Sequence, residues 1–434
     1  MSEIVQFCVV LVAFLALLLS GMWIPFAVSI SAVLYIYLAS GWDGFGGIGL
    51  AAWGSVNSFT LTAIPLFILM AELMMESGLT MRVYRGLSYL VRWLPGGLLQ
   101  TNVAGCAVFA AISGSSVATA VAIGSVALPQ LEQRGYSRGL AAGTVAAGGT
   151  LGILIPPSIA MIIYGTFTDT SISKLFMAGV LPGLALVLIF MLYVAIRCKV
   201  NPALAPRETL DAPPPAAQII ADLVPFGLLI FGVMGSLYAG IVTPTEAAAV
   251  GACLAAVISR IWGQLTWQAF RRSLRKTVQA SGAILFIVFA AYLFSYAIAM
   301  VGVTDELTHM LRAWNLSTLE LLLAIVVLYT ILGFVMDSIG IMVITVPILH
   351  PILTSYGIDP IWFGVLMVIL IELGQIHPPV GLNLFVVKSV SPKASFGEIT
   401  LGILPFCGLL YLLMVIMVAV PQLALWLPSS MNGG

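Results

Sequence analysis

Apolar stretches about as long as a lipid bilayer is thick recur along the whole 434-residue chain. A helix crosses the hydrocarbon core with about 20 apolar residues, whereas a membrane β-strand alternates apolar and polar residues. The composition agrees with helices, because 61% of the residues are hydrophobic and 8% are charged, against about 25% charged in soluble domains. The sequence therefore predicts an all-α polytopic membrane protein.

Charge and motif content exclude several classes of function. The 17 Lys and Arg residues balance the 17 Asp and Glu residues, and no run of basic residues resembles a nucleic-acid footprint, so nucleic acid is not an expected partner. The chain contains neither the GxxxxGK[ST] loop of ATPases nor an HExxH motif or a His and Cys cluster. We expect no enzyme activity, no catalytic residue and no bound organic cofactor. Transport would be driven by an ion gradient or by a partner.

Interruptions in the first half do not fit simple spans. After expected spans near 4–20, 22–40 and 59–77, the apolar run 98–131 is interrupted by Ser113-Gly114-Ser115-Ser116. Its two limbs are too short to cross a bilayer, which predicts a re-entrant hairpin. The run 139–168 contains Pro156-Pro157, which breaks a span because proline has no N–H donor. A span near 175–197 and a proline-rich cytoplasmic linker, 200–220, complete the repeat unit 1–199.

The second half, 221–434, repeats the landmarks of the first. Adding 222 to the residue number maps Ser116 onto Ser338, Gly152 onto Gly374 and Pro156-Pro157 onto Pro378-Pro379. The repeat predicts spans near 221–239, 244–262, 281–303 and 401–427, a hairpin at 320–354 and a broken span at 360–387, with Gln268–Thr277 as a separate basic helix at the membrane surface. About five crossings in each half would invert the second half, as in many secondary transporters.

The positive charges orient the chain in the membrane. With both termini on the periplasmic side, every Lys and Arg except Lys174 and Arg312 falls in a cytoplasmic segment. Cytoplasmic loops of membrane proteins are enriched in these residues. This threading makes the first hairpin enter from the cytoplasm and the second from the periplasm.

Helices that end at membrane depth leave backbone N–H and C=O groups without hydrogen-bond partners in the helix. Such groups are tolerated there only where they line a polar cavity or bind a ligand. We pair the tip at Ser113 to Ser116 with the break at Pro156 to Ser158, and the tip at Asp337-Ser338 with the break at Gly374 to Pro379. Carbonyl and hydroxyl oxygens suit Na⁺, and inward-facing helix N-termini suit an anion. Packing of small residues is the alternative for Gly-Ser-Ser, and hairpin capping is the alternative for Asp337.

Two ionisable residues lie beside the second break. Glu372 lies one turn before the break and is either a proton-binding site or a residue that supports the ion ligands. His377 precedes Pro378 and is either a pH sensor or a neutral, hydrogen-bonded side chain.

Five segments together resemble the large membrane subunit of the tripartite ATP-independent periplasmic (TRAP) transporters. They are CAVFAAISGSS from Cys106, PQLEQRGY from Pro129, GILIPPS from Gly152, TPTEAAA from Thr243 and GQIHPPVGLN from Gly374. The resemblance implies Na⁺-coupled uptake of a small organic anion, a carboxylate or sulfonate, across the bacterial inner membrane by an elevator mechanism. It also implies a small four-helix membrane subunit and a periplasmic substrate-binding protein as partners. With about ten crossings in 434 residues, we expect the small subunit to be a separate chain.

The same resemblance implies the site residues. Na⁺ would bind at two places, formed by Ser113, Gly114, Ser115, Ser116 and Pro156, and by Gly333, Asp337, Ser338, Thr345 and Gly374. Substrate would lie between the tips, against Ser116, Thr119, Pro157, Ser158, Ser338, Pro378, Pro379 and Asn383. Two alternatives stay open: a stand-alone Na⁺/dicarboxylate or citrate symporter that needs no binding protein, and an intramembrane enzyme acting through Asp337, Glu372 and His377.

Overall fold

Helices make up all the regular secondary structure of the residues that the computed structural model describes, 3–206 and 214–430. The first half contains α1 (Glu3–Leu19), α2 (Ile24–Ser40), η1 (Asp43–Gly47), α3 (Ile48–Val56), η2 (Thr60–Thr62), α4 (Ala63–Glu76), α5 (Leu79–Val91), α6 (Leu98–Ser113), α7 (Ser116–Gln133), α8 (Arg138–Leu154), α9 (Ile159–Thr168), α10 (Ile172–Val200) and η3 (Pro202–Leu204).

The second half contains α11 (Ala216–Ile230), η4 (Phe231–Gly235), α12 (Ser236–Tyr238), α13 (Pro244–Ile261), α14 (Trp267–Val301), α15 (Val303–Ala313), α16 (Thr318–Leu332), α17 (Ser338–Ser355), α18 (Pro360–Ile376), α19 (Leu382–Val390), α20 (Phe396–Ala419) and α21 (Gln422–Ser430). α11 begins inside the linker predicted for 200–220, whose residues 207–213 lie outside the described residues.

Residues at matching positions of the two halves have matching local roles. Ser115 is the N-cap of α7 and Asp337 is the N-cap of α17. Gly135 and Gly357, which follow these helices, have φ angles of +73° and +71°. Such angles strain a residue that has a Cβ atom, so glycine ends both hairpins for the same physical reason.

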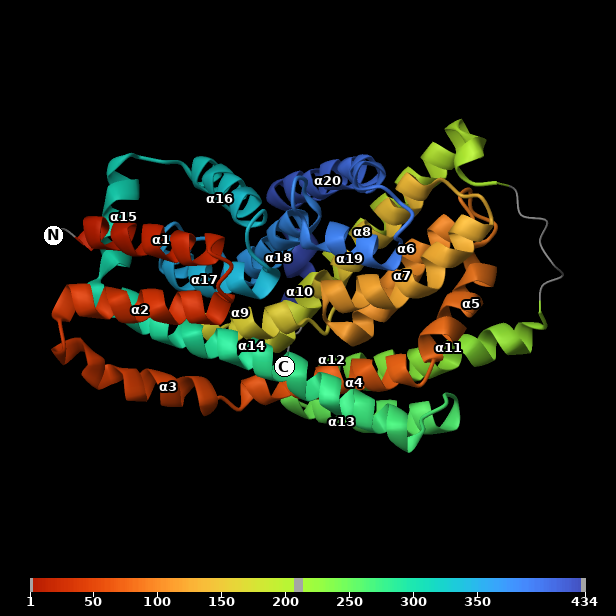
Figure 1. Ribbon diagram of the computed structural model, residues 1–434, viewed down its shortest axis with the longest axis horizontal. Coiled ribbons are helices and arrows are strands. Elements are labelled where there is room, and N and C mark those ends of the chain that lie inside the picture. The colour runs from red at the N-terminus through yellow and green to blue at the C-terminus, as the bar shows by residue number, and fades with distance from the viewer. Residues whose placement is uncertain (1–2, 207–213, 431–434) are drawn as a thin grey trace.

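The broken helices lie in the interior. Leu140–Leu154 of α8 and Trp362–Ile376 of α18 are buried without interruption. α8 packs against α6, α7, α18 and α20 (Figure 1). Small residues on α8 permit this close approach, because a Cβ atom on Gly143 would lie 2.3 Å from the carbonyl oxygen of Gly402.

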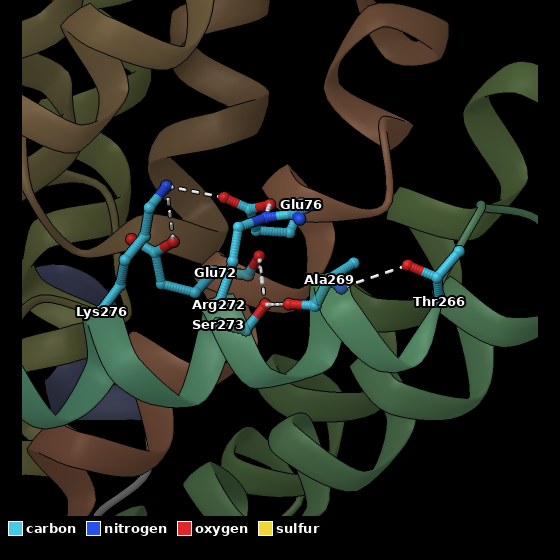
Figure 2. A network of polar contacts seen from close by, with 7 residues as sticks. All are labelled: Glu72, Glu76, Thr266, Ala269, Arg272, Ser273 and Lys276. Atoms are coloured by element: carbon cyan, nitrogen blue, oxygen red, sulfur yellow. Dashed lines mark hydrogen bonds and ion pairs between the residues drawn. The ribbon is translucent and has the colours of Figure 1, made fainter.

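The longest helix, α14, crosses the lower part of Figure 1. α14 packs against α2, α3, α4 and α17, and α13 packs against α4 in the lower part of Figure 1. A network of ion pairs joins α14 to α4 (Figure 2): Lys276 Nζ lies 2.7 Å from Glu76 Oε1 and 3.6 Å from Glu72 Oε2, and Arg272 Nε lies 2.8 Å from Glu76 Oε2. The Glu76 and Glu72 side chains are only 14% and 17% exposed.

Seven helices are long and apolar enough to cross a membrane in the described part of the chain, and eight spans result if Asp43–Val56 and Thr60–Glu76, bent by 49°, count as one. Shorter apolar helices, among them Ile4–Leu19 and Ile24–Ser40, would complete the expected crossings. The number of about five crossings in each half therefore stays a prediction.

Two predicted boundaries are wrong, and one helical segment was not predicted. Gln268–Thr277 is not a separate surface helix, because α14 runs through it without a break to Val301. The residues between 277 and the predicted span at 281–303 contain no proline, and the glycine at Gly282 costs only about 1 kcal/mol in a helix, so nothing there ends the helix. The last predicted span, 401–427, is divided, since α20 ends at Ala419 and Pro421 lacks the N–H needed to continue it. Helices at Asp43–Val56 were not predicted, because four closely spaced glycines resemble a loop.

Candidate ion and substrate site

The first hairpin tip is a turn with three oxygen-bearing side chains around it. α6 ends at Ser113, and Gly114 follows with φ +60°. The Ser113 and Thr119 hydroxyl oxygens are 2.6 Å apart, and Thr119 donates to the Ser115 carbonyl at 2.9 Å. Ser115 caps α7 by accepting from the amide of Ala118 at 3.4 Å. The tip therefore concentrates hydroxyl and carbonyl oxygens at the helix ends.

The first break lies directly against this tip. The amide of Ile159 donates to the Gly114 carbonyl at 3.4 Å, and a Cβ atom on Gly114 would lie 2.8 Å from the Pro157 carbonyl oxygen. Ser158, fully buried, donates to the Ile153 carbonyl at 2.6 Å and caps α9. Pro156 and Pro157 are buried and joined by a cis peptide bond. The structure brings together the tip and break residues that the sequence paired.

A residue of the second half completes this cluster. Asn383, at the start of α19, is fully buried and donates to the Ser116 hydroxyl at 2.7 Å and to the Ala146 carbonyl at 3.3 Å. Its side-chain oxygen has no hydrogen-bond partner among the described residues. A buried acceptor without a donor costs free energy, which suits a place where a ligand supplies the partner.

The second tip carries the carboxylate. Asp337 caps α17 by accepting from the amide of Gly340 at 3.1 Å, and Ser338 is half-buried beside it. A Cβ atom on Gly333, at the end of α16, would lie 2.3 Å from the Cα of Gly374 in α18. This backbone contact brings Gly333 and Gly374, both predicted for one Na⁺ site, together.

Thr345 lies about two helix turns further along α17 and has a partner that sequence reasoning missed. Its hydroxyl oxygen is 2.6 Å from the hydroxyl of Tyr329, and it also donates to the Ile341 carbonyl at 2.8 Å. Tyr329 is fully buried in α16. The adjacent hydroxyl-bearing residues Tyr329 and Thr330, in an otherwise apolar stretch of α16, were the signal that could have identified Tyr329.

The second break is more open than the first. Pro378 is half-buried and Pro379 is exposed, and their peptide bond is also cis. The Nδ1 atom of His377 lies 2.7 Å from the Pro378 carbonyl, and its ring centroid lies 5.4 Å from that of Phe334 beside the second tip. Substrate residues predicted on this side therefore face a more accessible space than Pro157 and Ser158 do.

Glu372 is the most isolated carboxyl group near the site. It is fully buried in α18, and neither carboxyl oxygen has a hydrogen-bond partner among the described residues. No cluster of three His, Cys, Asp or Glu side chains suited to a metal ion occurs in residues 3–206 and 214–430. The oxygens gathered at both tips are the ligands that hard cations prefer.

Comparison with known proteins identifies the family. Residues 11–423 match the family described as "Tripartite ATP-independent periplasmic transporter, DctM component". The chain belongs to this family. It is 34% identical to the C4-dicarboxylate TRAP transporter large permease of Vibrio cholerae, covering 97% of this chain and 98% of the relative. It is 36% identical to the corresponding Pseudomonas aeruginosa protein, covering 93% of this chain and 94% of the relative.

Other TRAP permeases are nearly as similar. The chain is 31% identical to the V. cholerae sialic acid TRAP large permease, covering 96% of this chain and 97% of the relative.

The solved YdaH transporter of Alcanivorax borkumensis has a TM-score of 0.65 over 95% of this chain and 98% of its own, at 17% identity, and so shares the fold. Its relatives are transport permeases, and the family together with the many apolar spans indicates a transport protein of the inner membrane.

Proposed function

We propose that this TRAP permease takes up a small organic anion, a carboxylate or sulfonate, together with Na⁺. The observation that carries the proposal is the contact of each hairpin tip with the broken helix of its own half, through Gly114 and Pro157 and through Gly333 and Gly374. Each contact brings a hairpin tip and its oxygen atoms against a broken helix inside an apolar protein, which supports the arrangement by which discontinuous helices hold ions and substrates.

Na⁺ occupies one site at each tip in this proposal. The first is formed by Ser113, Gly114, Ser115, Ser116 and Pro156, and the second by Gly333, Asp337, Ser338, Thr345 and Gly374. The hydroxyl cluster supports the first site, and the carboxylate supports the second because it neutralises the cation. Two Na⁺ ions or more accompany each substrate.

Substrate binds between the tips. The residues facing it are Ser116, Thr119, Pro157, Ser158, Ser338, Pro378, Pro379 and Asn383. The unpaired amide oxygen of Asn383 supports this place, since it can accept a hydrogen bond from a hydroxyl-bearing substrate. Relatives named for C4-dicarboxylates, sialic acid and isethionate support an anionic substrate class.

Movement is of the elevator type, with the two hairpins and broken helices carried past a scaffold drawn from both inverted repeats. Matching N-caps and glycines support the repeat, and the charge distribution supports periplasmic termini. A binding protein delivers substrate from the periplasm, and a small membrane subunit is a separate partner chain. The family's tripartite name supports both partners, and an Oleidesulfovibrio alaskensis relative named DctMQ, of which this chain covers 64%, supports the second.

Uptake into proteoliposomes tests the proposal. The vesicles contain the permease with its small subunit, and succinate, isethionate and sialate are offered with and without the binding protein, in Na⁺ or K⁺ gradients. We expect uptake to require Na⁺ and the binding protein and to be lost in Asp337→Ala. Asp359→Ala is the matched control, because Asp359 also caps a helix, α18, but is exposed. Uptake in K⁺ alone would refute Na⁺ coupling, and uptake without the binding protein would indicate a stand-alone symporter.

A further inference from the structure

A cavity of about 1170 Å³ lies where α5 meets the C-terminal ends of α7 and α10, at the opposite end of α7 from the first hairpin tip. α5 and α7 are on the right side of Figure 1. Four basic side chains line it, those of Arg85, Arg92, Arg134 and Lys199, and none of its described lining residues is acidic. A positively charged recess of this size fits an anionic group of considerable bulk.

The basic residues differ in how they are held. Arg85 pairs with Asp222 of α11, Nε to Oδ2 and Nη2 to Oδ1, both at 2.8 Å, and Asp222 is only 2% exposed. Asp222 also pairs with Arg82, whose Nε lies 3.1 Å from Oδ1, so the carboxylate holds Arg85 in place while its single negative charge is shared between two guanidinium groups. Arg92 lies over the ring of Tyr89, 5.9 Å from its centroid, and Lys199 is exposed in the last turn of α10. Arg92 and Lys199 therefore provide positive charge that a ligand can neutralise.

Exposed apolar side chains surround the same recess. Met81 and Trp93, which line it, are 50% and 78% exposed, and the adjoining Leu90 and Val200 are 54% and 76% exposed. In water such exposure would be unfavourable. Basic groups beside exposed tryptophan and aliphatic side chains are instead typical of the boundary between lipid headgroups and acyl chains.

We propose that this cavity binds the headgroup of an anionic phospholipid, with its phosphodiester between Arg92 and Lys199 and its acyl chains against Met81 and Trp93. The inference rests on the topology in the proposed function, which places the cavity at the cytoplasmic membrane surface. α5 packs against α11 on one side and against α6 and α7 on the other, so the lipid would contact a helix that connects separate parts of the fold.

Native mass spectrometry of the purified permease measures this binding. Cardiolipin, phosphatidylglycerol and phosphatidylethanolamine are added in detergent at matched concentrations, each with and without excess inorganic phosphate. We expect the two anionic lipids to bind preferentially and inorganic phosphate to leave them in place. Arg92→Gln combined with Lys199→Gln should weaken their binding by about 25-fold, since each basic residue near an anionic lipid contributes roughly fivefold.

Two controls make the result specific. Arg271→Gln with Arg275→Gln removes the same charge from exposed positions of α14 outside the cavity and should leave lipid binding unchanged. Arg92→Lys with Lys199→Arg keeps the charge and should retain most of it, and thermal unfolding checks that all variants fold.

Three results would each overturn the proposal. They are an equal loss of anionic-lipid binding in the two Gln double variants, equal binding of phosphatidylethanolamine and the anionic lipids, and displacement of the anionic lipids by inorganic phosphate. Loss of lipid when the small subunit is added would assign the cavity to that partner and also overturn it. Because the experiment involves no transport, its failure does not bear on the proposed function.

Discussion

The side-chain amide of Asn383 donates a 2.7 Å hydrogen bond to the hydroxyl of Ser116, 267 residues away in the chain. This bond joins the second broken helix to the first hairpin. It makes the first candidate ion site depend on both halves of the protein, because Ser116 directly follows the cap of α7.

Removing the hydrogen bond between Asn383 and Ser116 should reduce both the stability of the protein and its uptake activity. Asn383→Ala leaves the buried Ser116 hydroxyl without its donor, and we expect it to destabilise the protein by about 1–3 kcal/mol and to reduce uptake by at least about tenfold. Ser116→Ala and the double variant Ser116→Ala/Asn383→Ala complete a double-mutant cycle, in which thermal unfolding measures the stability of each variant. Strictly additive effects of the two substitutions would contradict a direct interaction.

Charge and capping at Asp337 can be separated by two substitutions. Asn retains an oxygen to accept from the amide of Gly340, whereas Ala loses the cap at a cost of about 1 kcal/mol. We expect Asp337→Asn to unfold near the wild-type temperature while the Na⁺ concentration for half-maximal uptake rises by about tenfold or more. An unchanged Na⁺ dependence in Asp337→Asn would remove the carboxylate from the ion site.

The contact between Gly333 and Gly374 leaves no room for a methyl group. Gly333→Ala should destabilise the protein by about 1–3 kcal/mol and reduce uptake, because the added Cβ would lie 2.3 Å from the Gly374 Cα. Gly282→Ala is the control, since nothing lies within 4 Å of its Cβ in α14. That substitution should be neutral or stabilising by up to about 1 kcal/mol. If both variants unfold at the wild-type temperature, the hairpin is not held closely against α18.

The ion pairs between α4 and α14 should contribute measurably to stability. Lys276→Met leaves Glu72 and Glu76 with less compensating charge, and we expect a loss between the about 1 kcal/mol of an exposed pair and the about 3–5 kcal/mol of a buried one (Figure 2). Lys393→Met is the comparison, because its side chain is 71% exposed while paired with Glu132. Thermal unfolding at low and high salt measures both, and a larger effect in Lys393→Met would be the contrary result.

Local chemistry accounts for the parts of the fold that were predictable. Proline pairs stop helices wherever they occur, and Asp, Ser or Gly at a helix end act through their own backbone or the next few amides. The ends of α6, α7 and α8 near Ser113, Ser116 and Pro156 therefore follow from a short stretch of sequence. The same rule failed at α14, where only packing decides whether a helix continues through an ambiguous junction.

The amino-acid sequence by itself determined that this protein is helical and membrane-embedded, where its helices break at Pro156 and Pro378, and which family it resembles, because these depend on composition, on short-range hydrogen bonding and on local motifs. Only the tertiary structure decided that Asn383 reaches Ser116, that Tyr329 meets Thr345 and that the first break is buried while the second is open. Those relationships depend on how helices distant in sequence pack, and packing is set by the shape of many side chains together.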